Sequence, residues 1–241
     1  MKGEQAEVGV ITGASQGIGR AIAIQLAREG VECILAGRTQ DPLIALAENI
    51  IAEGGKALNM ALDLADRRSI AAFTQRINAE FPKLGILINC GGMYSRGPWD
   101  RSSAEELDYL LETNVCGAFE LTRGLLPLLV RARGDIVFIN STITRGDGKG
   151  AGLFAASQHA LKGLADSLRA EVNEKGVRVL SVYPGRTATP RQERLYAAEG
   201  LTYHPTRLLQ PEDVAQAVVA CLKLPETAEV TELTIRPRYK H

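Results

Sequence analysis

The sequence predicts one doubly wound α/β domain, in which a seven-stranded parallel sheet is flanked by helices on both faces. Short, nearly continuous apolar runs rich in β-branched residues alternate with longer amphipathic stretches along all 241 residues. Strands that are apolar on both faces are typical of a parallel sheet covered by helices. No internal repeat, low-complexity tract or linker interrupts the pattern, so we expect residues 1–241 to form a single domain.

The predicted elements alternate as strand and helix in chain order. The apolar run 8–12 comes first, and a glycine-rich turn leads from it into an amphipathic stretch at 17–29. Further apolar runs predict strands at 31–36, 57–61, 85–89, 135–140, 177–183 and 229–235. Amphipathic stretches between them predict helices at 42–53, 67–80, 103–131, 152–174 and 212–223.

Local signals support two helix starts and mark one connection as irregular. Ser102 or Ser103 can cap the helix 103–131, with two glutamates in its first turn near the positive end of the helix dipole. Pro211 opens the last helix. The connection at about 185–210 contains prolines and glycines and shows no regular period. Long connections of this kind are usually functional, so we expect a substrate lid there.

Composition excludes several classes of function. Lys plus Arg and Asp plus Glu both number 28, so no net basic field draws the chain to nucleic acid or anionic lipid. No apolar run approaches the ~20 residues of a membrane helix. The first residues are polar and lack the apolar region of a signal peptide. We therefore expect a cytoplasmic protein without nucleic-acid or membrane partners.

The cysteines are predicted to be buried, reduced thiols. Cys33, Cys90, Cys116 and Cys221 are widely spaced within apolar stretches, with no C-x-x-C pair and no histidine at ligand spacing. Such a pattern favours neither disulfides nor a metal site.

A glycine-rich turn follows the first strand and leads directly into a helix. Glycines at its bends allow the backbone to approach a pyrophosphate, and the helix N-terminus offers amide donors with partial positive charge. This strand–turn–helix context predicts dinucleotide binding. The expected contacts are Gly13, Ser15, Gln16, Gly17, Ile18 and Gly19.

The end of the second strand predicts which dinucleotide is bound. NAD-binding proteins usually place an acidic residue there to hold the ribose hydroxyls, but this chain has Gly37 followed by Arg38. A guanidinium can clamp a 2′-phosphate with two parallel hydrogen bonds. We therefore expect NADP(H) in preference to NAD(H), although Arg38 could also be a solvated surface residue. Asp63, followed by Leu64, is placed to meet the adenine.

Further motifs lie at the ends of the later strands and in one helix. They are Asn89-Cys90-Gly91-Gly92, Asn114 in the helix 103–131, Ser141, and Pro184-Gly185 with Thr187 and Thr189. Together with the turn at 12–19, they resemble the short-chain dehydrogenase/reductase family over essentially the whole chain. The resemblance implies a Rossmann fold, NAD(P)-dependent oxidoreductase activity and catalytic roles for Asn114 and Ser141. It also implies cofactor contacts by Asn89, Gly91, Pro184, Gly185, Thr187 and Thr189.

The two residues that carry the proton in that family are replaced here. The family's tyrosine and lysine positions fall on Phe154 and Gln158, and the flanking residues match the family, so no register shift explains the change. In relatives the tyrosine hydroxyl protonates the carbonyl oxygen, while the lysine lowers the tyrosine pKa and holds the nicotinamide ribose. Phe154 cannot donate a proton, but the amide of Gln158 can still contact the ribose. We expect cofactor binding to survive and the family's proton transfer to be lost.

A replacement proton donor is expected at the carboxyl edge of the sheet. Tyr94, two residues past Gly92, is one candidate, and its alternative role is that of a pocket wall. Arg145, Asp147 and Lys149 form a second group of candidates. These residues could supply a proton, bind an anionic substrate or simply face solvent.

Three interpretations stay open. The first is an NADP(H)-dependent oxidoreductase that moves hydride to or from a small organic substrate without the family's tyrosine and lysine. Ser141 and a water at Asn114 could then polarise a carbonyl. The second is a catalytically silent protein that binds NADP(H) as a structural or sensing ligand. The third is an ordinary carbonyl reductase whose residues 154 and 158 were altered deliberately.

Broad apolar faces on the helices 103–131 and 152–174 predict an assembly. In the family these helices pack against those of a neighbour, which implies a homodimer or homotetramer.

Overall fold

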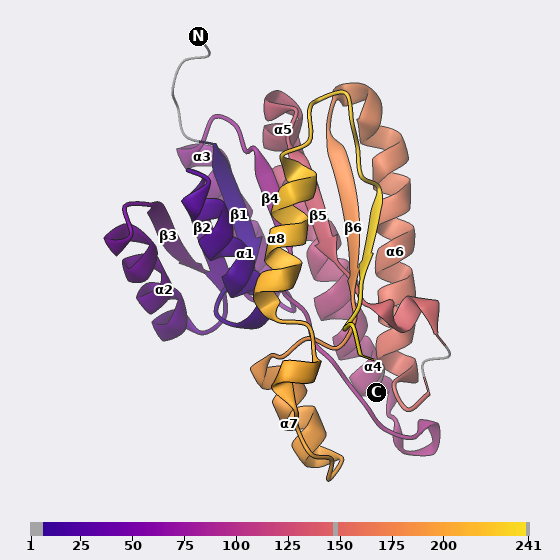
Figure 1. Ribbon diagram of the computed structural model, residues 1–241. Coiled ribbons are helices and arrows are strands. Elements are labelled where there is room, and N and C mark those ends of the chain that lie inside the picture. Colours follow the sequence, from indigo (N-terminus) through magenta and orange to yellow (C-terminus); the bar gives the residue numbers. More distant parts are fainter. Residues whose placement is uncertain (1–6, 147–148, 240–241) are drawn as a thin grey trace.

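The chain forms the predicted α/β architecture in a computed structural model that describes residues 7–146 and 149–239 (Figure 1). Within this described part, seven strands form one parallel sheet with the order β3-β2-β1-β4-β5-β6-β7. The strands are β1 Val8–Thr12, β2 Glu32–Gly37, β3 Lys56–Ala61, β4 Ile86–Asn89, β5 Asp135–Ile139, β6 Arg178–Pro184 and β7 Glu232–Ile235. The strand order reverses between β1 and β4, and ligands of such folds bind outside the carboxyl ends at that point.

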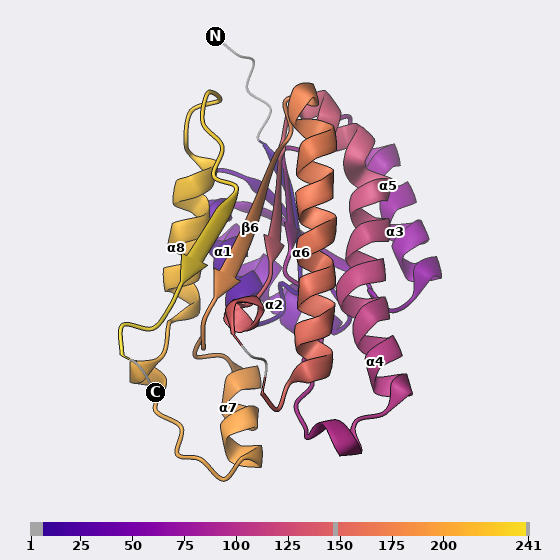
Figure 2. The ribbon, with the colours of Figure 1, turned by 90° about the vertical axis from the view of Figure 1, so that its right-hand side faces the viewer.

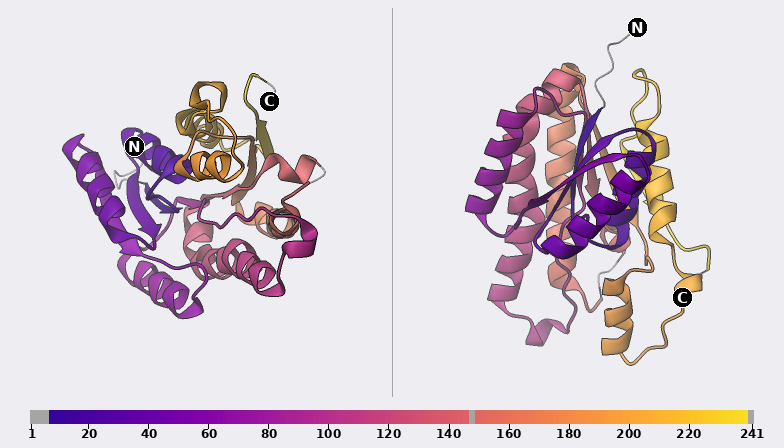
Figure 3. Two further views of the ribbon diagram at one scale, coloured as in Figure 1. Left: turned by 90° about the horizontal axis from the view of Figure 1, so that it is seen from below. Right: turned by 90° about the vertical axis from the view of Figure 1, so that its left-hand side faces the viewer.

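Helices cover the sheet on both faces (Figures 1 and 2). One face carries α1 Gly17–Arg28, α2 Gln40–Ala52 and α8 Pro211–Leu222. The opposite face carries α3 Arg67–Glu80, α4 Ala104–Leu111, α5 Gly117–Ala132 and α6 Gly152–Val172. Helix α7, Pro190–Ala198, lies beyond the carboxyl ends of the strands, apart from both layers (Figures 1 and 3).

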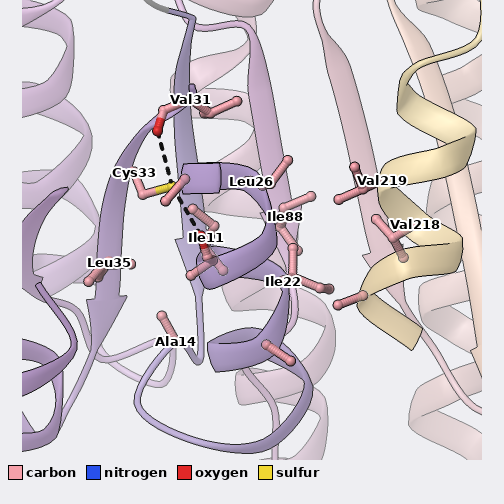
Figure 4. Packing of buried hydrophobic residues seen from close by; sticks show 14 of the residues in the cluster. Ile11, Ala14, Ile22, Leu26, Val31, Cys33, Leu35, Ile88, Val218 and Val219 are labelled. Atoms are coloured by element: carbon pink, nitrogen blue, oxygen red, sulfur yellow. Dashed lines mark hydrogen bonds between the residues drawn. The ribbon is translucent and has the colours of Figure 1, made fainter. Parts of the chain in front are cut away.

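Apolar side chains of the sheet and the helices form one core on each face. On the first face, Ile22 of α1, Ile11 of β1 and Val218 of α8 are fully buried in a single cluster (Figure 4). The thiol of Cys33 in β2 also lies here and contacts the carbonyl of Ala23 at 3.5 Å. These cores hold the strand ends, and therefore the loops that leave them, in fixed positions.

The helix predicted at 103–131 is interrupted, which corrects the expectation of one continuous helix. A π-helical turn, Glu112–Cys116, separates α4 from α5. The helix then passes so close to the sheet that a Cβ at Gly117 would lie 2.1 Å from the carbonyl oxygen of Leu64. The sequence pattern predicted helix across this segment but did not distinguish the π-helical turn from the α-helix around it.

The predicted lid at 185–210 is not irregular throughout, because it contains the nine-residue helix α7. The hydroxyl of Thr189 accepts a hydrogen bond from the amide of Gln192 at 3.2 Å and caps this helix. Pro190 occupies the first turn, where its missing N–H costs nothing. The capping signal was present in the sequence, but the short polar helix has no apolar period to reveal it.

Candidate functional site

A cleft of about 870 Å³ opens along the carboxyl ends of the central strands, beneath α7. Its lining extends from Arg38 and Asp63 at one end to Phe154 and Gln158 at the other. It includes most of the residues predicted to bind a cofactor: Gly13, Ser15, Gln16, Gly17, Ile18, Gly19, Leu64, Asn89, Gly91, Pro184, Gly185, Thr187 and Thr189. The structure therefore brings the predicted site residues together in one elongated cleft.

The glycine turn has the geometry of a phosphate cradle. Gly13 and Gly17 have positive φ angles of 66° and 57°, which other residues rarely adopt. A Cβ at Gly19 would lie 2.4 Å from the carbonyl oxygen of Gly13, so the backbone itself closes the turn. Helix α1 begins after Gln16 without a side-chain cap and without an acidic residue in its first turn. Its first amides are thus left to bind an anion.

Thr12 fixes the loop that follows β4. Its hydroxyl donates to the carbonyl of Ile88 at 3.2 Å and accepts from the amides of Cys90 and Gly91, both at 2.9 Å. This three-way contact joins the end of β1 to the loop at residues 89–92, which forms the floor of the cleft beside the glycine turn.

The end of the cleft that is predicted to bind adenosine combines one arginine with one carboxylate. Arg38 is exposed at the end of β2, and its guanidinium donates to the hydroxyl of Tyr109 at 3.1 Å. Its second contact is with the sulfur of Met93 at 3.7 Å, so it has neutral partners only within the described residues. Asp63 accepts from the amide of Ala65 at 3.0 Å and lines the cleft.

Asn114 holds a loop in place with its side chain. The Asn114 amide donates to the carbonyl of Met93 at 2.9 Å and to the hydroxyl of Ser157 at 3.0 Å. Its oxygen accepts from the Met93 amide at 2.6 Å. These bonds use both N–H donors of the side chain, so a water at Asn114 would have to donate to its oxygen. The π-helical turn brings Asn114 into this position between α6 and the loop after β4.

Ser141 follows β5 and begins a short 3₁₀ turn, Thr142–Arg145. Its hydroxyl oxygen accepts from the Ile143 amide at 3.2 Å. The far end of the turn is fixed by Arg145, which pairs with Glu232 of β7 and lies 4.5 Å from the ring centre of Tyr183. Arg145 is therefore a structural residue on the β7 side and does not line the cleft.

Phe154 contacts a second aromatic ring in the cleft. It is 8% exposed at the start of α6, and its ring centre lies 4.6 Å from that of Tyr94, with 54° between the ring planes. Tyr94 belongs to the loop after β4 and is half-buried. The sequence made Tyr94 a candidate proton donor only by its position after β4. The structure places its ring in contact with the ring of Phe154, which cannot donate a proton.

Three buried oxygens of residues that line the cleft lack partners. The side-chain oxygens of Gln158, Asn89 and Thr113 are buried and form no hydrogen bond with the described residues. Gln158 is 4% exposed, so its orphaned oxygen carries a free-energy cost unless a ligand or water donates to it. A ribose carries such hydroxyl donors. Together with the open α1 amides and the glycine cradle, these acceptors fit a bound dinucleotide.

The segment that carries α7 contacts the loop after β4 through arginines. Arg191 of α7 donates to the carbonyl of Gly92 at 2.6 Å, and both residues line the cleft. Desolvation lowers the pKa of Arg191, and no carboxylate pairs with it in the described structure. Arg96 forms a second bridge at 2.7 Å to Glu199 at the end of the lid helix. No sequence pattern predicts the contact of Arg191 with Gly92 or the ion pair of Arg96 with Glu199, because each joins segments about a hundred residues apart.

The remaining predicted residues fall outside the reacting end or carry structural roles. The lid bends at Thr187, which is buried and donates to the Gly185 carbonyl at 3.0 Å. Lys149 lines the cleft, whereas Asp147 lies outside the described residues. His159 contacts the Ala155 carbonyl at 2.8 Å within α6, as expected for a structural histidine.

Charge along the cleft is mostly positive. Among the described lining residues, the cations are Arg38, Arg96, Lys149, Arg186, Arg191 and Arg194, and the one carboxylate is Asp63. This excess of positive charge favours an anionic ligand. In the same described ranges, no helix is long and apolar enough to cross a membrane, and no group of three metal-ligating side chains occurs. All four cysteines are free, and burial raises the pKa of Cys33 and Cys90 to about 12.

Comparisons with known proteins agree with this geometry. The family model for short chain dehydrogenases matches residues 7–200. Glycine betaine reductase ATRR from Emericella nidulans is 32% identical over 96% of this chain, which spans only 19% of that protein. An alcohol dehydrogenase from Thermococcus sibiricus, solved with 5-hydroxy-NADP, superposes with a TM-score of 0.86 at 28% identity, covering 98% of this chain and 99% of that one. A metagenomic short-chain oxidoreductase in complex with NADP has a TM-score of 0.83 at 29% identity, covering 97% and 98%.

Proposed function

Because the chain belongs to the short chain dehydrogenase family, we propose that it is an NADP(H)-dependent oxidoreductase. The proposed substrate is a small carbonyl compound, enone or imine. The observation that carries this proposal is the complete cofactor cradle, from the glycine turn to the orphaned oxygen of Gln158. The proposed reaction uses neither Phe154 nor Gln158 as a proton carrier.

Three features support NADP(H) over NAD(H). Arg38 stands where a 2′-phosphate would lie, and its present partners are neutral groups that a phosphate can displace. The lining of the cleft is strongly cationic. The two solved neighbours described above carry NADP or 5-hydroxy-NADP.

In the proposed complex, the chain orients the cofactor and shields the reacting atoms. The first amides of α1 hold the pyrophosphate, while Gln158 accepts from a ribose hydroxyl. A bound dihydronicotinamide supplies hydride to the electrophilic carbon of the substrate. The hydroxyl of Ser141 hydrogen-bonds the substrate heteroatom, and Phe154 with Tyr94 forms the apolar wall beside it.

Fluorescence titration with NADPH and NADH tests the cofactor assignment. We expect NADPH to bind the wild type more tightly than NADH. Arg38→Leu should weaken NADPH binding about tenfold to hundredfold and leave NADH nearly unchanged, because a charge-assisted hydrogen bond contributes about 1.5–3 kcal/mol. Arg76→Leu, which removes an exposed arginine of α3, is the matched control. Equal loss for both cofactors in Arg38→Leu would contradict the assignment.

Turnover of added substrates tests the activity. NADPH oxidation is followed with ketones (cyclohexanone, ethyl pyruvate, acetophenone), an enone (2-cyclohexen-1-one) and an imine (2-methyl-1-pyrroline). Oxidation that depends on one of them supports an oxidoreductase. Tight NADPH binding without turnover of any would support the second candidate, a silent protein that binds NADP(H). The replacement of both titratable groups by Phe154 and Gln158 is the observation that favours that second candidate.

We also propose a homodimer or homotetramer built on α4, α5 and α6. Phe119 of α5 is 46% exposed and Tyr109 of α4 is 41% exposed, although both are large apolar rings. Light scattering measures the assembly directly. Phe119→Asp is expected to lower the molar mass, and an unchanged mass would contradict this interface.

A further inference from the structure

Two aromatic rings in the cleft together carry one hydroxyl. Tyr94 and Phe154 lie 4.6 Å apart between ring centres, and both line the cleft beside Ser141 and Gln158. The Tyr94 hydroxyl is therefore carried by the ring that packs against Phe154, the residue at the family's tyrosine position. Phe154 comes from α6 and Tyr94 from the loop after β4, so the two rings form opposite halves of one wall.

The hydroxyl of Tyr94 is available to a ligand. It makes no hydrogen bond to any described residue, although its ring is half-buried. The loop that carries it is held firmly, because Asn114 bonds both the amide and the carbonyl of neighbouring Met93. A fixed ring with an unpaired hydroxyl in a cleft is a suitable hydrogen-bond donor to substrate.

A cation lies close enough to Tyr94 to affect its chemistry. Arg191 of the lid points into the cleft at the Gly92 carbonyl, two residues from Tyr94. Arg191 and Tyr94 both line the cleft, and Arg191 has no carboxylate partner in the described ranges. A guanidinium without a neutralising partner thus faces the same cleft as the Tyr94 hydroxyl.

The other titratable groups that line the cleft are less suitable. Asp63 lies at the adenosine end, away from Phe154. The Cys90 thiol is held protonated, because burial raises its pKa to about 12. Lys149 already interacts with another residue. Among the described residues that line the cleft, Tyr94 is the only tyrosine.

We propose that Tyr94 is the proton donor of this protein, with the guanidinium of Arg191 stabilising the phenolate that remains. This inference rests on the proposed function, since it assigns the acid of that reaction. The phenol and the guanidinium thus take over, from the loop after β4 and the lid, the tasks that the family assigns to two residues of α6. The substrate class that such a pair serves is a carbonyl compound.

The proton balance of the step is simple. Hydride that a bound dihydronicotinamide would supply forms a C–H bond at the carbonyl carbon, while the C–H bond that held this hydrogen on the dihydronicotinamide and the C=O π bond would break. The O–H bond of Tyr94 breaks at the same time, and its proton forms the O–H bond of the alcohol. The carbonyl compound is reduced and the dihydronicotinamide is oxidised. The Tyr94 phenolate recovers a proton from water through the open cleft.

Because Tyr94 and Phe154 are in contact, exchanging the two residue types moves the hydroxyl from one ring to the other and keeps one tyrosine and one phenylalanine in the pair. Tyr94→Phe removes the hydroxyl, and Tyr94→Phe with Phe154→Tyr returns one hydroxyl to the other ring. Tyr239→Phe, which changes a tyrosine 56% exposed near the chain end, is the matched control. NADPH affinity within about twofold of wild type shows that each variant is folded and binds the cofactor.

Turnover of cyclohexanone, ethyl pyruvate and acetophenone is the first readout. We expect Tyr94→Phe to lower the rate about 10²–10⁴-fold, as for loss of a general acid. The double variant Tyr94→Phe with Phe154→Tyr should turn over at least about tenfold faster than Tyr94→Phe alone. Tyr239→Phe should have the turnover rate of the wild type. Arg191→Gln should move the basic limb of the pH–rate profile to higher pH, because it removes the charge that stabilises the phenolate.

Binding without turnover is the second readout. Calorimetry measures the Kd of the fastest of these three ketones in the presence of NADP⁺, where no reduction can occur. Tyr94→Phe should raise that Kd about threefold to tenfold, the effect of one hydrogen bond. Wild-type turnover and Kd in Tyr94→Phe would overturn the role of Tyr94 and leave the proposed function intact. Turnover of the enone or imine alone would also overturn it, whereas failure to bind NADPH would overturn the proposed function itself.

Discussion

Thr12 joins the glycine turn to the loop after β4, and the change Thr12→Val tests how strongly this junction stabilises the fold. A methyl group replaces the hydroxyl at nearly constant shape. The Ile88 carbonyl then loses a donor at 3.2 Å, and the amides of Cys90 and Gly91 lose an acceptor at 2.9 Å. Thr12 is 1% exposed and Ile88 is fully buried, so water cannot replace the donor that the Ile88 carbonyl loses.

The expected loss follows from counting those groups. A buried donor or acceptor without a partner costs about 1–3 kcal/mol. Cys90 and Gly91 are half-buried beside the cleft, so water replaces part of the lost bond and the lower half of that range applies. We expect Thr12→Val to reduce the free energy of unfolding by about 3–7 kcal/mol, about 1–2 for each amide and about 1–3 for the carbonyl. Thr12→Ser keeps the hydroxyl and should lose about 1 kcal/mol with its methyl group.

Urea unfolding followed by circular dichroism measures both variants. NADPH titration of the same samples gives a second readout, because the loop at residues 89–92 lines the cleft and should loosen only in the valine variant. If Thr12→Val is as stable as Thr12→Ser, the three hydrogen bonds contribute nothing and the reasoning is wrong. If stability falls but NADPH affinity does not, the loop is held by other contacts.

Two further predictions follow from close contacts and charge. Gly19→Ala places a Cβ 2.4 Å from the Gly13 carbonyl oxygen and should weaken NADPH binding about tenfold or more, measured by fluorescence. Gly163→Ala, a helical control with open space around it, should leave binding unchanged and raise the urea midpoint. A hydrogen bond from Lys162 lowers the pKa of Glu232, so the stabilisation is present at neutral pH and is lost as the pH falls through the folded value. The difference in urea midpoint between wild type and Glu232→Gln should therefore disappear in acid, and a constant difference would contradict this.

Features set by local chemistry could be predicted from the sequence. Strand ends, the glycine turn and the placement of Arg38 depend on residues adjacent in the chain, and the structure puts them where the pattern indicates. The observed strands differ from the predicted ones by up to three residues, at the start of β7. The strands could be predicted because helices bury both faces of the parallel sheet, so each strand is a nearly continuous apolar run in the sequence.

Features set by contacts between distant segments could not be predicted. The pairing of Tyr94 with Phe154 depends on how the loop after β4 is held by Asn114, and no periodicity records that. Arg145 seemed a candidate for substrate binding, yet its partner Glu232 lies 87 residues away and turns it toward β7. The helix at 190–198 was missed because its stability comes from a cap and from tertiary contacts rather than from an apolar face.

The site depends on residues beyond the part of the chain that the family model matches, which ends at residue 200. Glu232 anchors the turn that begins at Ser141, and the Ile235 carbonyl accepts from the Gly185 amide at 2.8 Å. Pro237 packs so closely on Gly185 that a Cβ there would lie 2.9 Å from its ring. A fragment limited to residues 7–200, which the family model matches, would therefore lack residues that hold the site together. Removal of the last dozen residues is expected to damage the reacting end of the cleft, about a hundred residues earlier in the chain, as well as to uncover part of the core under β7.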